Sequence, residues 1–194
     1  MIEGFLIRAA DIAAQPWRNG GGRTRELLAW PNADAWTLRV SVADIAADGP
    51  FSSFESVVRW IVVLSGSGVE LTLARGPTQV MRGDPPLRFG GEEAPMCRLI
   101  DGPTRDLNLM LRTDASSRAD GGMLPVVDHR PWSPVHACCG VYAAVDGVCH
   151  VANRVVGMDA DTLLWFDAPP PVLRFAARRD IGETIGYWLQ GGAR

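Results

Sequence analysis

The chain of 194 residues contains no lysine, and all 19 of its basic residues are arginine. A Walker-type phosphate loop requires a lysine, and a Schiff-base enzyme requires a lysine amine. The glycine triplet Gly20-Gly21-Gly22 also lacks the G-x-G-x-x-G spacing of a dinucleotide-binding loop. The sequence therefore excludes three common classes of site.

Long apolar runs and blocks of one charge are also missing. The formal net charge is −3 and no basic block occurs, so neither nucleic acid nor an anionic membrane surface is an expected partner. No run reaches the length of a membrane span, and Met1 to Ala14 lacks the continuous apolar stretch of a signal peptide. We therefore expect a cytoplasmic protein, and the sequence leaves a homodimer open.

Cysteine is scarce and arranged unlike a disulfide framework. The four cysteines are Cys97, Cys138, Cys139 and Cys149, and two of them are adjacent. Neither a disulfide scaffold nor a C-x-x-C zinc site is built from a vicinal pair. We predict four reduced thiols.

The residues that are present indicate an all-β protein. Glycine (21) and proline (14) separate short runs rich in Val, Leu, Ile, Thr and Trp, and no comparable stretch has a helical apolar stripe. Asp146-Gly147, between two apolar runs, predicts a hairpin with a type I′ turn. The predicted strands are Thr24 to Leu28, Trp36 to Ala43, Val57 to Leu64, Gly68 to Leu73, Thr78 to Met81, Arg98 to Ile100, Leu107 to Arg112, His136 to Val145, Val148 to Arg154, Thr162 to Phe166 and Val172 to Ala176.

A polar, small-residue connector follows the seventh predicted strand and has no periodicity. It divides the chain into an N-terminal half (1–112), a connector (113–124) and a C-terminal half (125–194). Many short strands at close spacing are typical of barrels or sandwiches.

Several strands carry single polar residues on one face. Arg39 and Ser41 alternate with apolar residues, as do Thr24 and Asn108 on their own strands. Such a face is either exposed to solvent or lines a cavity. The variety of polar types, each in a single copy, favours a cavity.

Five motifs in order give the chain a resemblance to the HutD/Ves family of bacterial proteins. They are Trp17-Arg-Asn-Gly-Gly-Gly-Arg-Thr-Arg-Glu26, Trp36-x-x-Arg-x-Ser-x-Ala43, Gly49-Pro-Phe-Ser-x-Phe54 followed by Arg59, Leu64-Ser-Gly-Ser-Gly68 and Asp106-x-Asn-x-Met110. The resemblance implies a bicupin, with two small antiparallel β-barrels of the double-stranded β-helix type in one chain. One departure is Glu55-Ser56, where the family usually has Pro-Gly, which predicts an altered loop path ahead of Arg59.

The resemblance also implies a function linked to histidine utilisation and a regulatory role. The ligand that it suggests is a small anionic metabolite such as N-formylglutamate, or a formate-like group. Arginine forks, amides and hydroxyls suit a carboxylated ligand. The candidate ligand-binding residues are Asn19, Thr24, Glu26, Arg39, Ser41, Arg59 and Asn108, and the candidate rim comprises Trp17, Gly20, Gly21, Gly22 and Met110.

Two alternatives to this site remain. Arg39 and Arg59 could form an internal ion pair with Glu26, although one glutamate cannot balance two arginines. The cavity could instead belong to a metal-free enzyme, an isomerase or hydrolase acting on a small polar acid, and no catalytic residue is identified.

A metal site is not expected, and neither is any other cofactor. Many cupins bind metal through histidines, but the first half contains none. In the second half His136 and Cys138 share a strand face, whereas Cys149 and His150 point to opposite faces. A structural role is the expected one for these residues.

Overall fold

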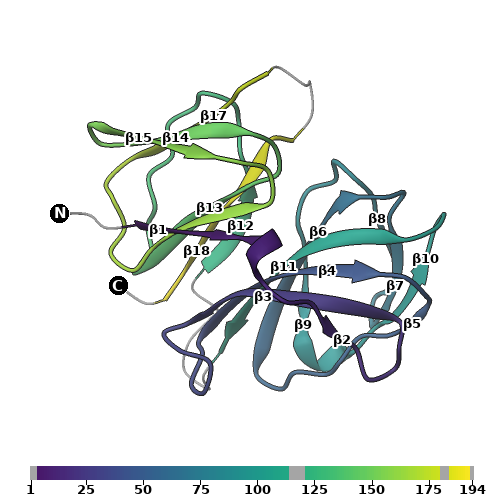
Figure 1. Cartoon of the computed structure of the whole chain (residues 1–194). Helices are drawn as coiled ribbons and strands as arrows, with labels where there is room; N and C mark the ends of the chain where they lie inside the picture. Colours follow the sequence, from purple (N-terminus) through teal and green to yellow (C-terminus); the bar gives the residue numbers. More distant parts are fainter. Residues whose placement is uncertain (1–3, 114–120, 180–183, 193–194) are drawn as a thin grey trace. The chain divides into compact units, whose positions relative to one another are not determined.

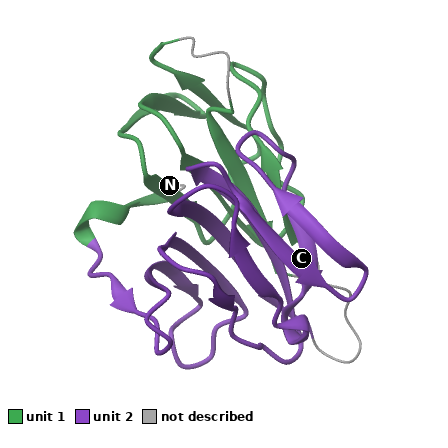
Figure 2. Ribbon diagram, turned by 90° about the vertical axis from the view of Figure 1, so that its right-hand side faces the viewer, with its two compact units in different colours: residues 1–11, 120–194 green, residues 12–119 purple. Residues whose placement is uncertain are grey.

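The computed structural model describes residues 4–113, 121–179 and 184–192 (Figure 1). In these ranges every regular element is a β-strand or a short 3-10 helix, and no helix is long and apolar enough to cross a membrane. The chain forms two compact units (Figure 2): unit 1 contains residues 1–11 and 120–194, and unit 2 contains residues 12–119. The prediction of an all-β protein is confirmed.

Unit 2 contains two antiparallel sheets. One has the order β2-β3-β4-β11-β6-β9 and the other the order β5-β10-β7-β8, and the 3-10 helix η2 (Gly91–Glu93) follows β9. The strands are β2 (Gln15–Pro16), β3 (Gly22–Trp30), β4 (Leu38–Ile45), β5 (Gly49–Pro50), β6 (Val57–Ser65), β7 (Val69–Leu73), β8 (Gly76–Val80), β9 (Leu87–Gly90), β10 (Met96–Leu99) and β11 (Thr104–Arg112).

The core of unit 2 joins the two sheets. Ile45, Ile61 and Val63 of the six-stranded sheet pack with Val69 and Leu71 of the four-stranded sheet in one buried cluster. Because side chains alternate along a strand, the face that carries Ile45 and Ile61 also carries the polar residues of β4, β6 and β11. One face of this sheet thus supplies both an apolar core and a polar surface.

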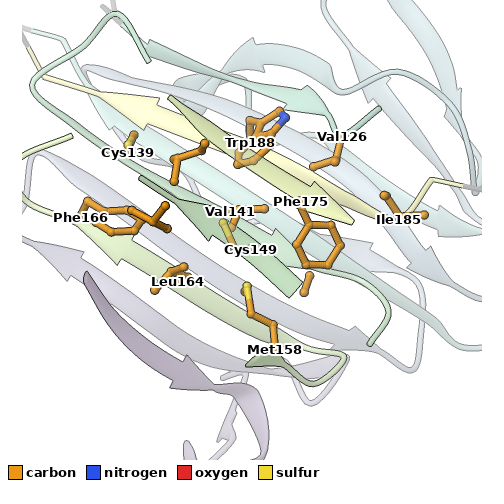
Figure 3. Packing of buried hydrophobic residues seen from close by; sticks show 13 residues of the cluster. Val126, Cys139, Val141, Cys149, Met158, Leu164, Phe166, Phe175, Ile185 and Trp188 are labelled. Carbon is orange, nitrogen blue, oxygen red and sulfur yellow. The ribbon is translucent and has the colours of Figure 1, made fainter. Parts of the chain in front are cut away.

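Unit 1 has a five-stranded sheet of order β1-β16-β13-β18-β12 and a three-stranded sheet of order β15-β14-β17. Its elements are β1 (Gly4–Arg8), the 3-10 helix η1 (Ala9–Asp11), β12 (Gly121–Pro125), β13 (Cys138–Ala143), β14 (Gly147–Val151), β15 (Arg154–Met158), β16 (Thr162–Phe166), β17 (Leu173–Ala177) and β18 (Gly186–Gly191). Its interior is filled by apolar side chains from both sheets, including Val141, Cys149, Phe175 and Trp188 (Figure 3).

The first strand departs from the predicted division of the chain, which placed residues 1–11 in the N-terminal half. β1 instead pairs antiparallel with β16, from Gly4 opposite Phe166 to Arg8 opposite Thr162. A Cβ at Gly4 would collide with the Phe166 ring, at 2.4 Å. The short sequence of β1 gives no sign of this partner, because the pairing joins segments more than 150 residues apart.

The predicted hairpin at Asp146-Gly147 is wrong. β13 and β14, which flank this dipeptide, belong to different sheets. Gly147 does not have a positive φ, and its glycine is required by close packing, since a Cβ would lie 2.4 Å from the Phe175 ring. The tight hairpin lies further on, where Val151 pairs with Arg154 across a two-residue turn and Ala152 has a φ of 50°.

Most predicted strands correspond to observed ones, with shifted ends. Trp36 lies outside β4, which begins at Leu38, and the predicted strand Val148 to Arg154 divides between β14 and β15. The prediction missed six whole strands: β1, β2, β5, β9, β12 and β18. These are short or contain glycine and proline, so they lack the run of β-branched residues that identifies a strand.

All four cysteines are unpaired and buried. Cys139 and Cys149 lie in the core of unit 1, Cys97 lies in that of unit 2, and the Cys138 thiol donates to the Gly191 carbonyl at 3.1 Å. Burial raises the pKa of Cys97, Cys138 and Cys149 to about 12, and it raises that of Cys139 further. The thiolate forms are therefore absent at neutral pH.

We expect all four thiols to resist a thiol-specific reagent in the native protein, because only the exposed thiolate reacts quickly. Mass spectrometry would count the labels before and after denaturation, and the denatured chain should carry four. Rapid labelling of any cysteine in the native protein would contradict this burial.

Candidate functional site

Unit 2 contains a cavity of about 460 Å³. Its walls come from the β2–β3 hairpin, from β4, β6 and β11, and from the segment that follows β5. The lining residues are Gln15, Pro16, Trp17, Arg18, Asn19, Thr24, Arg39, Ser41, Ala43, Pro50, Phe51, Ser52, Phe54, Arg59, Asp106, Asn108 and Met110.

The strand register sets the polar residues in rows across the sheet. In one row Met110 stands between Arg39 on β4 and Arg59 on β6. In the next row Asn108 lies opposite Ser41, which in turn lies opposite Glu26. Neighbouring strands are about 4.8 Å apart, so residues from distant parts of the chain come within reach of one ligand.

The β2–β3 hairpin forms one wall through its aromatic and amide side chains. The Trp17 indole N–H donates to Thr24 Oγ1 at 2.7 Å, and the Trp17 ring contacts the Phe51 ring edge-on. Asn19 Oδ1 accepts a hydrogen bond from the Gly21 amide at 3.0 Å. Trp17 and Asn19 both line the cavity.

The glycine triplet shapes this hairpin and does not line the cavity. Gly20 has a φ of 74°, a value that favours glycine. A Cβ at Gly22 would lie 2.5 Å from the Asp44 carbonyl oxygen. Of the predicted rim, Trp17 and Met110 line the cavity, whereas Gly20, Gly21 and Gly22 are not among its lining residues.

Arg59 is the central cation of the cavity and is only 5% exposed. Its Nη2 donates to Asn108 Oδ1 at 2.9 Å and its Nη1 donates to the Ser52 carbonyl at 3.5 Å. Its Nε is buried and has no hydrogen-bond partner among the described residues. Burial lowers the pKa of Arg59 to about 10; the negative charge of Asp106 opposes this shift and the positive charge of Arg39 adds to it.

Three aromatic rings surround the guanidinium of Arg59. Its Cζ lies 5.1 Å from the centroids of Phe51 and Phe89 and 5.7 Å from that of Phe54. At these distances the ring quadrupoles attract the cation. The rings hold the guanidinium in place without neutralising its charge.

The sequence analysis missed Asp106, which lines the same cavity and is fully buried. The Asn108 amide donates to its Oδ1, and its Oδ2 has no hydrogen-bond partner among the described residues. Burial raises the pKa of Asp106 to about 7, although the charge of Arg59 and the bond from Asn108 lower it. The spacing could have revealed it, since Asp106 and Asn108 are two residues apart on one strand and so share a face.

Glu26 forms an ion pair with Arg39, so the alternative of an internal pair holds for Arg39. It does not hold for Arg59, which has no ion pair with a carboxylate among the described residues. The Glu26 side chain is 39% exposed and does not line the cavity. Its place in the predicted ligand set is therefore indirect, through Arg39.

The loop ahead of Arg59 keeps the backbone shape that a glycine favours. Ser56, which stands where the family usually has Gly, has a φ of 54°. A serine therefore adopts the left-handed conformation, and Arg59 still faces the cavity. The altered loop path expected from the missing glycine is not seen at this residue.

The donor set of the cavity does not fit a transition metal. No imidazole or thiolate is among its lining residues, and three guanidinium groups, those of Arg18, Arg39 and Arg59, make the lining mainly positive. In the part of the chain that the structure describes, no three His, Cys, Asp or Glu residues cluster as metal ligands. His150 lies on β14 opposite Arg174, and His129 lies 3.8 Å from the Asp128 carboxylate.

Comparison with known proteins shows which family the chain belongs to. A family model described as HutD matches residues 9–181. The chain belongs to the HutD family. Protein Ves of Citrobacter koseri is 38% identical over 192 residues, covering 98% of this chain and 96% of Ves. An uncharacterised 21.2 kDa protein from the hutC 3′ region of Pseudomonas putida is 37% identical over 107 residues, which span 54% of this chain and 56% of that protein.

Solved structures agree with this assignment. HutD from Pseudomonas fluorescens SBW25, in a formate condition, matches with a TM-score of 0.82 at 25% identity and covers 99% of this chain and 100% of that one. A Cupin 2 conserved barrel domain protein from Leptotrichia buccalis has a TM-score of 0.57 at 11% identity, covering 97% and 96%. This second likeness shows a cupin-like all-β fold.

Ser56 allows a direct test of the loop conformation. An L-residue in the left-handed region costs about 1–2 kcal/mol. Glycine avoids this cost, but it loses more conformational entropy on folding, which offsets part of the gain in stability. Ser56→Gly should therefore raise the free energy of unfolding by about 0.5 kcal/mol or more, measured by denaturant titration. Ser53→Gly is the matched control, because Ser53 is exposed in the same loop without a positive φ. A loss of stability in both variants would contradict the prediction.

Proposed function

We propose that the cavity of unit 2 binds a small carboxylated metabolite. The observation that carries the proposal is Arg59, a buried guanidinium whose Nε is unpartnered and which has no ion pair with a carboxylate among the described residues. A buried cation without an ion-pair partner costs several kcal/mol, and the nearby charge of Asp106 compensates Arg59 only in part. An anionic ligand in the cavity would offset that cost.

The surrounding groups suit an organic acid of modest size. Ser41 and Thr24 add hydroxyls, Arg39 adds a second guanidinium, and Trp17 supplies an apolar surface. The volume of about 460 Å³ lies within the range of small-molecule sites. The proposed ligand class is that of N-formylglutamate, with at least one carboxylate directed at Arg59.

The proposed role is regulatory and belongs to histidine utilisation or related amino-acid metabolism. Membership of the HutD family and the P. putida relative from the hutC 3′ region support it. We propose that the protein works in the cytoplasm and that its partner is a small metabolite. Neither nucleic acid nor a membrane is a proposed partner. Each unit is proposed to be one cupin-type barrel of a bicupin, and the paired sheets of each unit support this.

Asp106 favours a second candidate, a metal-free enzyme that uses the same cavity. A buried carboxyl with a pKa of about 7 is matched to proton transfer at neutral pH. Such an enzyme would be an isomerase or hydrolase acting on a small polar acid. Turnover of the ligand, followed by mass spectrometry, would distinguish this candidate from a binding protein.

Binding is tested with N-formyl-L-glutamate and two arginine variants. Ligand at about 100 times its Kd should raise the free energy of unfolding by roughly 2.7 kcal/mol, seen as a higher melting temperature. Arg59→Met should reduce this shift by half or more, because the loss of a charge-assisted contact removes about 1.5–3 kcal/mol of binding free energy. Methionine keeps an apolar contact with the three rings, so stability without ligand should change little or rise.

Arg88→Met is the matched control. Arg88 lies on β9 in the same unit, is exposed, and stacks on Trp60 at 5.6 Å outside the cavity. The Arg88→Met variant should bind the ligand as the wild type does. An unfolded Arg59→Met variant would mark Arg59 as structural, and an Arg59→Met variant that binds normally would move the site elsewhere.

Metal content is a separate prediction. Protein purified without a histidine tag should contain well under one zinc, iron or manganese ion per chain, measured by elemental analysis, because the cavity offers no imidazole or thiolate. Stoichiometric metal bound through His136 or His150 would overturn the assignment of the site to unit 2.

A further inference from the structure

Asp106 is a charged group that the proposed anion site does not explain. A carboxylate beside an anion-binding arginine should repel the ligand, yet Asp106 lines the cavity and is completely buried. Its Oδ1 is held by the Asn108 amide, and its Oδ2 has no hydrogen-bond partner among the described residues. The backbone N–H of Ala43 on β4 also acts on this carboxyl and lowers its pKa, so Oδ2 is the oxygen without a full hydrogen bond among the described residues.

Asn108 links Asp106 to Arg59. Its Oδ1 accepts from Arg59 Nη2 at 2.9 Å, and its Nδ2 donates to Asp106 Oδ1. Both ends of the amide are thus engaged within the protein. Arg59 Nε and Asp106 Oδ2 are both buried without a hydrogen-bond partner among the described residues. Arg39 Nε is also without a hydrogen bond there, but the charge of Arg39 is paired with Glu26. Arg59 Nε and Asp106 Oδ2 are therefore the groups that we assign to a ligand.

We propose that Asp106 is the second recognition group of the cavity: it is protonated in the complex, and its Oδ2–H donates a hydrogen bond to the bound anion. This inference rests on the proposed function, since it requires a carboxylate at Arg59. Binding then takes up one proton together with the anion. The site would select ligands that present acceptor oxygens to Asp106.

Electrostatics favours the protonated form once an anion has bound. In the empty cavity the pKa of Asp106 is about 7, because burial outweighs the lowering effect of Arg59. A bound anion would neutralise Arg59 and add its own negative charge nearby. Both changes disfavour an ionised Asp106. Affinity should therefore be full below about pH 7 and fall as the pH rises through that value.

The charged and titratable groups around Asp106 lie on β3, β4, β6 and β10. Burial and the positive charge of Arg39 on β4 lower the pKa of Arg59 on β6 to about 10, which is still above neutral. Burial raises the pKa of Cys97 on β10 to about 12. Burial acts to raise the pKa of Asp44 on β4, but Arg25, Arg23 and Arg105 together lower it. Glu26 on β3 is paired with Arg39.

Isothermal titration of N-formyl-L-glutamate would test the inference. The Kd should be about tenfold weaker at about pH 8 than at about pH 6. At about pH 8, two buffers with different ionisation enthalpies should report the uptake of close to one proton. This measurement needs only the wild-type protein.

Asp106→Asn removes the titrating group and keeps a donor, the amide N–H, where Oδ2–H stood. Its affinity should be independent of pH and close to that of the wild type at about pH 6. Asp101→Asn is the control, because Asp101 is exposed in the same unit and outside the cavity. It should keep the wild-type pH dependence.

The outcomes separate this inference from the proposed function. Binding with no proton uptake and no pH dependence would overturn the role of Asp106 and leave the anion site standing. Proton release on binding would also overturn it, since the ligand would then donate to an ionised Asp106. An absence of binding at every pH would overturn the proposed function itself.

Discussion

A buried guanidinium requires acceptors and negative charge around it, and the cavity of unit 2 is arranged around this requirement at Arg59. Asn108 and the Ser52 carbonyl supply acceptors, and three phenylalanine rings supply a weaker attraction. Together they leave Nε unsatisfied. A protein that needed only a stable core would place an apolar residue there, since well-packed apolar groups often replace buried charges without loss of stability.

Two of the arginines that line the cavity, Arg39 and Arg59, differ in their electrostatic environment. Arg39 is paired with Glu26 and partly exposed, so its charge is already compensated. The charge of Arg59 is compensated in part by Asp106, which forms no ion pair with it and whose own pKa is about 7. Arg39 is therefore charge-paired within the protein, whereas the compensation of Arg59 varies with pH.

The two units of this HutD-family protein also differ in their interiors. In unit 1 the space between the sheets is occupied by apolar side chains such as Phe175, Met158 and Trp188. In unit 2 the same kind of space is shared between an apolar cluster and the polar lining of the cavity. Both units have paired antiparallel sheets, and in unit 2 part of the interior is a cavity with a polar lining.

The sequence by itself determined the all-β class, the family and most of the polar residues of the cavity. Strand alternation is a local property, so Arg39 and Ser41 could be assigned to one face of their strand, and Asn108 to the polar face of its own strand, without knowing their neighbours. The tertiary structure decided the rest. Pairing of β1 with β16, the sheet change at Gly147 and the isolation of Arg59 from Glu26 all depend on contacts between distant segments. The shifted proton affinity of Asp106 also arises only in the folded protein, because desolvation is a property of the surroundings and not of the residue.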